Sequence, residues 1–177
     1  MANTLVFLRV TFLTVIFNRN LVLTLLVPAV LMTLVGSLYA YYLFRQKKDN
    51  KNVPSEKIDL GSPLNILSAL GFGLLYIGVG IMLFYANQWL GSGGVYLTGV
   101  VGGLADVDAM TISISKFQNI SVQIAVNVIV IATTVNTIVK LIIAILRGSK
   151  NLRRKAVFGM GAMICIGLAY LGLMLVF

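Results

Sequence analysis

Long, nearly uninterrupted runs of apolar residues limit what this chain can fold into more than any other feature. Residues 21–44, 64–86 and 156–177 each supply the roughly 20 apolar residues that a helix needs to cross the hydrocarbon core of a bilayer. The run 122–146 is as long but includes several polar side chains. The sequence therefore predicts an all-α integral membrane protein.

The composition agrees with a chain that stays in the bilayer. Of its 177 residues, 59% are hydrophobic and 11% are charged, whereas soluble domains have about 45–50% and about 25%. Two further apolar segments, 5–17 and 96–115, are short or contain charged residues. We predict a single transmembrane domain over 1–177, a polytopic bundle of about five to six transmembrane helices.

The net charge of +9 is concentrated rather than spread. Most basic residues lie in two clusters between apolar runs, 45–57 and 147–155. Basic flanks of this kind are topology signals, and they attract anionic lipid head groups. The predicted partner is therefore the lipid bilayer rather than nucleic acid, and 45–62 is predicted to be an aqueous basic loop.

The residues that usually carry enzyme chemistry are scarce. The chain has no His and a single Cys, Cys165 inside an apolar run, so neither a zinc site nor a disulfide framework is expected. No phosphate loop or nucleophile elbow occurs. We expect no enzyme activity and no cofactor. The first residues lack a basic stretch and a cleavage site, so we expect a retained helix rather than a signal peptide.

The segment 96–115 is unusual, because Gly102-Gly103 is followed closely by Asp106 and Asp108. Charged side chains at this depth cost about 2.5–3.5 kcal/mol each and often mark functional sites. The glycine pair predicts a helix break. A helix that restarts offers amides to a carboxylate, and freed carbonyls can coordinate a cation. We expect Asp106 to cap the new helix and Asp108 to be the functional carboxylate.

Further polar side chains in the apolar runs extend this candidate ion- or substrate-binding site, namely Arg9, Asn127, Asn136 and Lys140. Two interpretations remain open. In one, an aspartate pairs with Lys140 or Arg9, and the asparagines bridge helices. In the other, the aspartates bind a cation or a proton near the middle of the bilayer. The glycine break favours the second.

A metal ion held by Asp106 and Asp108 is the most specific form of that hypothesis. Hard divalent cations take six or more oxygen ligands, and two carboxylates supply few of them. A transiently bound small inorganic ion is therefore favoured over a tightly held divalent metal.

The distribution of basic residues bears on topology. If every apolar segment crossed the membrane, six basic residues would lie on each face, whereas one face normally has an excess. Three explanations remain open. The first is that the segment 96–115 is re-entrant, which leaves both basic clusters in the cytoplasm. The others are that the chain inserts in both orientations as an antiparallel dimer, or that a partner sets its orientation. We favour the re-entrant segment, because the glycine break supports it independently.

Glycines recur at spacings that permit close helix packing. Gly71 and Gly78 are seven residues apart, and Gly99 and Gly103 form a pair four apart. We expect a homodimer to which Gly99 and Gly103 contribute. The alternative, that these glycines pack helices only within one protomer, remains open.

Several blocks of the sequence resemble a known family over nearly the whole chain. They are Gly103-Leu104-Ala105-Asp106-Val107-Asp108-Ala109, Phe7-Leu8-Arg9-Val10, Asn18, Gln88-Trp89-Leu90-Gly91 and Asn136-Thr137-Ile138-Val139-Lys140. The first block is the most specific. The family is the uncharacterised C-terminal membrane domain attached to many MgtC/SapB-type proteins, and these 177 residues do not themselves contain an MgtC-like domain.

The resemblance implies a multi-pass protein of the plasma membrane in a bacterium or archaeon. It also adds Asn18 to the candidate site. Our leading expectation is an ion- or proton-linked transporter or channel. The alternative is a structural or regulatory subunit that binds a partner such as an MgtC-like protein.

Overall fold

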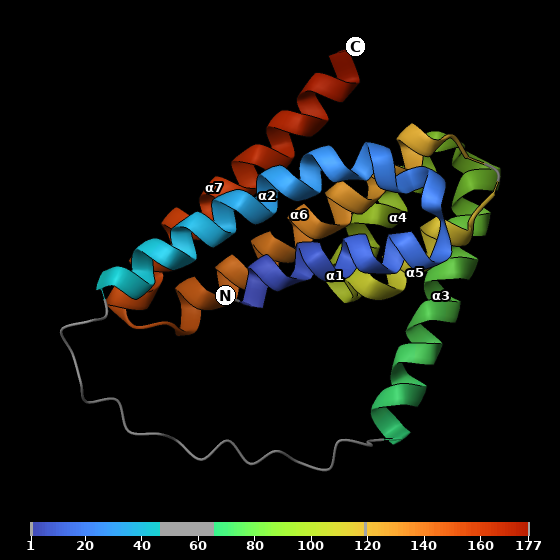
Figure 1. Ribbon diagram of the computed structural model, residues 1–177. Coiled ribbons are helices and arrows are strands. Elements are labelled where there is room, and N and C mark those ends of the chain that lie inside the picture. Colours follow the sequence, from blue (N-terminus) through green and yellow to red (C-terminus); the bar gives the residue numbers. More distant parts are fainter. Residues whose placement is uncertain (1, 47–65, 119, 177) are drawn as a thin grey trace.

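The fold consists of helices, in a computed structural model that describes residues 2–46, 66–118 and 120–176. Most of the predicted loop 45–62 lies outside these ranges. The described part contains seven helices and no strand: α1 (Ala2–Phe17), α2 (Arg19–Gln46), α3 (Ile66–Leu90), α4 (Ser92–Ala105), α5 (Val107–Lys116), α6 (Val122–Arg147) and α7 (Lys150–Val176). Figure 1 shows their arrangement.

Four of the described helices are long and apolar enough to cross a membrane. Their candidate spans are Arg19–Leu43, Ala69–Leu90, Val122–Arg147 and Arg153–Met174. Two other helices, α1 and α4, are apolar but shorter. The prediction of a helical membrane protein is therefore confirmed. We expected five to six membrane-spanning helices, and four of the described helices are long and apolar enough to span.

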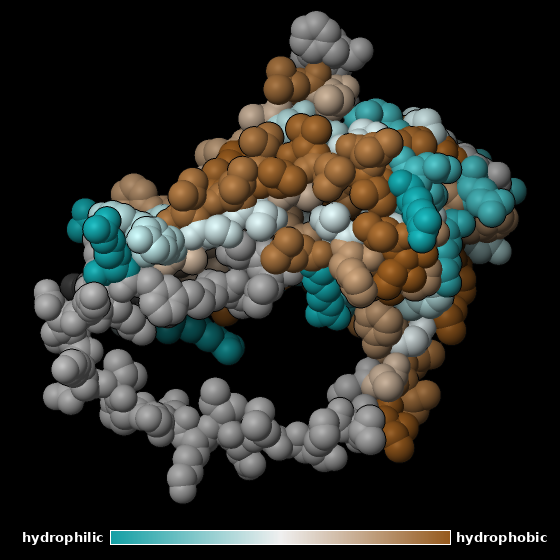
Figure 2. All heavy atoms as spheres, viewed as in Figure 1, coloured by the Kyte–Doolittle hydropathy of each residue, from teal (hydrophilic) through white to brown (hydrophobic). Residues whose placement is uncertain are grey.

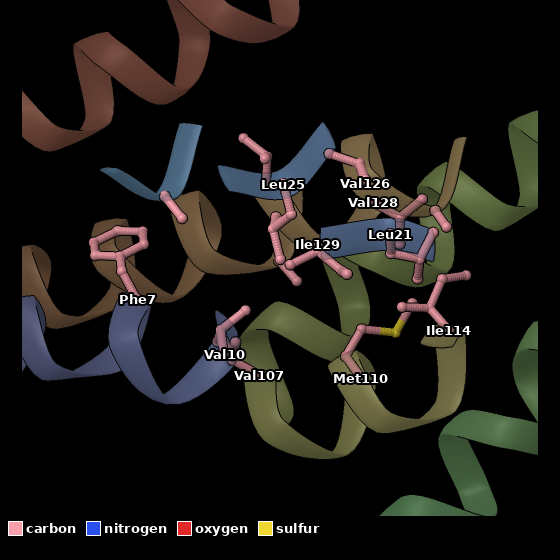
Figure 3. Packing of buried hydrophobic residues seen from close by; sticks show 14 of the residues in the cluster. Phe7, Val10, Leu21, Leu25, Val107, Met110, Ile114, Val126, Val128 and Ile129 are labelled. Atoms are coloured by element: carbon pink, nitrogen blue, oxygen red, sulfur yellow. The ribbon is translucent and has the colours of Figure 1, made fainter. Parts of the chain in front are cut away.

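The centre of the molecule is formed where α1, α2, α5 and α6 pack together. Figure 3 shows buried side chains from α1, α2, α5 and α6 pointing toward one another, with Phe7, Val10, Leu25 and Ile129 among them. Pro28 of α2 lines a small apolar cavity in this region. Proline is tolerated inside a membrane helix because neighbouring helices support the freed backbone.

The segment between α3 and α6 folds into a helical hairpin. Gly99 of α4 lies against Val128 of α6, and Gly103 lies against Ala132, so α4 and α6 run in the same direction. The chain then reverses, because Met110 of α5 lies against Gly102 of α4. Residues 117–121 join α5 to the start of α6, and five residues reach at most about 18 Å. The hairpin therefore ends near the end of the bundle where it began.

Because the hairpin returns to the end where it began, the basic residues are distributed unequally between the two ends of the bundle. The hydroxyl of Tyr39 on α2 donates a hydrogen bond to the Lys155 carbonyl at 2.6 Å, which places the end of α2 beside the start of α7. Five exposed basic residues gather at this end of the bundle, namely Arg45, Arg147, Arg153, Arg154 and Lys155.

The opposite end of the described bundle has few basic residues. Lys116 lies there, with its ammonium 4.7 Å from the centre of the Phe17 ring, and Arg19 begins α2 nearby. Figure 2 shows hydrophilic side chains at the two ends of α2 and hydrophobic surface between them. The basic residues of the described bundle are therefore divided unequally between its two ends.

Helix α3 leaves the bundle at a steep angle, so that its N-terminal end lies away from the other helices (Figure 1). Only 11% of its candidate span is buried, against 39% for α6. A Cβ atom added at Gly71, Gly73, Gly78 or Gly80 would meet nothing within 4 Å. The close packing predicted for Gly71 and Gly78 is therefore not found within the described chain.

Replacing Gly103 tests the packing that fixes the hairpin. A Cβ at Gly103 would lie 2.5 Å from the Ala132 carbonyl oxygen. We expect Gly103→Ala to destabilise the protein by about 1–3 kcal/mol, the usual cost of overpacking, as measured by thermal unfolding in detergent. The matched control is Gly73→Ala, which we expect to leave the melting temperature unchanged or raised. Equal effects of the two substitutions would contradict this packing.

Candidate functional site

The helix break lies at Asp106, between α4 and α5. This residue has extended backbone angles, φ −157° and ψ 119°. Its Oδ1 atom accepts hydrogen bonds from the amides of Asp108 at 2.8 Å and Ala109 at 2.9 Å. Asp106 is thus the N-cap of α5, as predicted, and its carboxylate satisfies amides that a helix start leaves without partners.

The two glycines predicted to form the break do something different. Gly102 and Gly103 are helical and buried, and α4 continues through both to Ala105. Gly102 accommodates Met110, and Gly103 lets α4 approach the backbone of α6. The predicted position of the break is therefore wrong by a few residues, because these glycines were needed for packing rather than for a change of direction.

The pair Gly99 and Gly103 was also predicted to contribute to a homodimer. Both residues are instead buried against Val128 and Ala132 of α6 in the same chain. The packing alternative for this pair is the one that the structure shows.

Asp108 forms an ion pair with Arg9 across the contact between α5 and α1. The distance between Arg9 Nη2 and Asp108 Oδ2 is 2.7 Å. The two partners differ in exposure, since 66% of the Arg9 side chain but only 15% of the Asp108 side chain is accessible. The aspartate is therefore held within the protein, while its arginine partner lies at the outer surface of the bundle.

The far side of the break is bounded by α6. Asn136 donates a hydrogen bond from Nδ2 to the Gly103 carbonyl at 3.3 Å, and so satisfies one of the carbonyls left free at the end of α4. Lys140 follows one helical turn later on the same face of α6. It lies close enough to Asp106 and Asp108 for their charges to act on it, although among the described residues the Arg9–Asp108 contact is the ion pair found within 4.0 Å.

The structure thus brings together five of the seven predicted site residues, namely Arg9, Asp106, Asp108, Asn136 and Lys140. The other two lie elsewhere. Asn18 donates to the Ser115 carbonyl at the end of α5. Asn127 accepts from Gln123 and donates to the Tyr96 hydroxyl. Both serve contacts between or along helices rather than the break.

Sequence reasoning missed the support at the end of α5. Lys116 lies over the rings of Phe17 and Tyr76, and the Ser113 hydroxyl approaches the Tyr76 carbonyl. The available signal was the return of polar residues after Asp108 at positions three or four apart, a spacing that places them on one helix face.

The two aspartates have different chemical capacities. One oxygen of Asp106 already accepts two amide hydrogen bonds, so this side chain is committed to the backbone. Asp108 is held by a side chain that can move away, so it can exchange partners. No group of three or more His, Cys, Asp or Glu side chains able to hold a metal occurs among the described residues. The arrangement therefore offers one exchangeable carboxylate.

Substitutions at Asp106 test its capping role. Asp106→Ala removes the acceptor for two amides, so we expect it to destabilise the protein by about 1 kcal/mol. Asp106→Asn keeps an acceptor and should leave the unfolding temperature nearly unchanged. The measurement is thermal unfolding of both variants in the same detergent. A large loss in the Asn variant would show that the charge of Asp106, and not its cap, stabilises the fold.

The Arg9–Asp108 pair gives a separate test. Asp108→Asn leaves Arg9 unpaired at the outer surface of the bundle, where a lone arginine facing lipid costs about 2.5–3.5 kcal/mol on insertion scales. We expect low expression of folded Asp108→Asn, judged by size-exclusion chromatography. The double variant Arg9→Met/Asp108→Asn should recover wild-type yield. Failure of the double variant to recover would contradict a stabilising pair.

Comparison with known proteins places this sequence in a family. Residues 1–148 match a family described as a domain of unknown function, DUF4010. An uncharacterised protein of Aquifex aeolicus is 28% identical over 151 residues, which are 83% of this chain and 65% of that protein. The chain thus spans somewhat less than two thirds of this relative.

No solved structure matches the chain. The resemblance to a membrane domain of unknown function is confirmed, while its link to MgtC/SapB-type proteins stays a prediction. Because the match covers most of the sequence, including the helix break, the chain belongs to the DUF4010 family.

Proposed function

We propose that this membrane protein is an ion- or proton-linked transporter or channel in which Asp108 is the exchangeable binding group. The observation that carries the proposal is the ion pair between a sheltered aspartate and an exposed arginine, placed at the break of a helical hairpin. Broken helices at membrane depth are tolerated where they are buried in protein or line a cavity. In transporters, such breaks frequently hold the coupling ion.

The depth of the break supports a position within the bilayer. Helix α4 has 14 residues before the break, which corresponds to about 20 Å at the helical rise. Asn136, which donates a hydrogen bond to the end of α4, is 14 residues from the start of α6. The break therefore lies at the same distance from the start of α6 as from the start of α4. If α4 and α6 begin at one membrane surface, the hairpin is re-entrant and Asp108 lies well inside the hydrocarbon, nearer the basic end of the bundle.

The charge of the site favours a monovalent ion. Two aspartates and two basic residues, Arg9 and Lys140, balance each other while Arg9 remains on Asp108. When Arg9 withdraws, the remaining groups carry one net negative charge, which a proton or one alkali cation neutralises. A divalent ion fits less well, because it requires several oxygen ligands and Asp106 is committed to its amides.

Arg9 then acts as a tethered cation that substitutes for the ion. Its exposed side chain on α1 can swing away without moving the helix. Lys140 keeps the site from becoming strongly negative, which limits how tightly an ion is held and so favours release. By the positive-inside rule, the five-residue basic end faces the cytoplasm. We place the protein in the plasma membrane of a prokaryote.

A second candidate is a structural or regulatory subunit that binds another membrane protein. The observation that favours it is α3, whose glycines face open space and whose N-terminal half has few neighbours. A partner helix, such as one from a homodimer or from an MgtC-like protein, would pack there through small residues. This role requires no ion flux.

Flux through purified protein in liposomes distinguishes the two candidates. We expect wild-type protein to conduct protons, sodium or potassium above empty vesicles. The folded double variant Arg9→Met/Asp108→Asn should show no flux, because it lacks the exchangeable carboxylate. Arg19→Gln, at the end of the bundle away from the break, serves as the matched control and should conduct.

Two outcomes would contradict the transport proposal. One is the absence of flux for protons, sodium, potassium and magnesium in wild-type liposomes, which would leave the subunit role. The other is wild-type flux in the double variant, which would show that ions pass without Asp108.

A further inference from the structure

The basic end of the bundle forms a defined surface. We call Arg45, Arg147, Arg153, Arg154 and Lys155 the interfacial basic patch. It is built from the C-terminal ends of α2 and α6 and from the first two turns of α7. All five side chains are exposed.

The backbone beneath this patch is held in place by α2. The Tyr39 hydroxyl bonds to the Lys155 carbonyl, and the Tyr39 ring lies against Gly159, where an added Cβ would collide with it. The Gly148 amide at the end of α6 donates a hydrogen bond to the Ala144 carbonyl, and α7 starts two residues later. The helix ends that carry the patch are therefore fixed relative to one another.

The positive charge of the patch has no counterpart in the described part of the chain. The acidic residues there are Asp106 and Asp108, which are committed to the helix break. The first turn of α7 contains no acidic residue, although helix starts usually favour negative charge. Three basic side chains follow within the next turn. The like charges repel each other, and an anion bound among them would relieve that repulsion.

Apolar side chains border the patch on the sides of α2 and α7. Leu38, Tyr41 and Tyr42 are exposed on α2, and Val157 and Phe158 are exposed on α7. Tyrosines at the end of a membrane helix mark the level of the lipid head groups. A ligand at this place meets basic groups at one end and an apolar surface at the other.

We propose that the interfacial basic patch binds an anionic phospholipid, with its phosphodiester among the arginines and its acyl chains along α2 and α7. Free phosphate and nucleic acid share the anionic group but have nothing to place against Leu38 and Phe158. The proposal is independent of ion transport, because the patch lies apart from the break and uses none of its residues.

Lipid titration of the purified protein tests the proposal. Native mass spectrometry in detergent should show phosphatidylglycerol binding in preference to phosphatidylcholine. The variant Arg153→Gln/Arg154→Gln should bind phosphatidylglycerol about thirty-fold more weakly, since each basic group near an anionic lipid surface contributes roughly five-fold. Arg19→Gln, at the opposite end, is the matched control and should bind as wild type does.

Thermal unfolding keeps the test interpretable. Phosphatidylglycerol should raise the unfolding temperature of wild-type protein, whereas inorganic phosphate and glycerophosphoglycerol, which lacks acyl chains, should not. In phosphatidylcholine, Arg153→Gln/Arg154→Gln should have the unfolding temperature of wild-type protein, which would show that this variant folds. Equal binding of the two lipids, equal loss in Arg19→Gln, or full stabilisation by inorganic phosphate would each overturn the proposal.

Discussion

A helix that stops inside a bilayer leaves amides and carbonyls that lipid cannot satisfy. In this fold the interruption falls at Asp106, and the chain supplies its own partners there. The Asp106 carboxylate accepts hydrogen bonds from two amides of α5, and Asn136 donates one to a carbonyl of α4. The bond from Asn136 would not form if α4 stood farther from α6, whereas the Asp106 bonds are local to the start of α5. Gly99 and Gly103, which allow the two backbones to approach, are therefore the condition for the hairpin and for the site beside it.

Once the break is satisfied by Asp106 and Asn136, the remaining charges acquire distinct roles. Asp108 is one residue beyond the first amide of α5 and is left to a side chain from another helix. Lys140 follows Asn136 along α6 and adds a balancing charge without forming a close pair. The formal charges of Arg9, Lys140, Asp106 and Asp108 therefore cancel, which matters in an apolar protein because single charges in a bilayer are costly.

Much of this arrangement could be predicted from the sequence. Apolar length indicated the membrane helices, and the glycines before two aspartates indicated an interruption, with Asp106 as its cap. The position of the break was less certain, because a glycine pair is typical both of a break and of close packing. The choice of Arg9 as the partner of Asp108 could not be made, since the sequence offered two basic residues at similar depth. The divergence of α3 was also beyond prediction, because lipid and protein interior are equally apolar and leave no signal for which helix faces are covered.

The dependence of the hairpin on α6 has a consequence for how the protein is made. Helices α4 and α5 precede α6 in the chain, so they emerge from the ribosome before Ala132 and Asn136 do. During that interval Asp106 and Asp108 lack the supporting helix, and α4 is too short to cross the bilayer unaided. The hairpin must therefore wait at the membrane surface or within the insertion machinery until α6 arrives. Biogenesis is then ordered by sequence position, with α6 as the element whose synthesis commits the chain to its final topology.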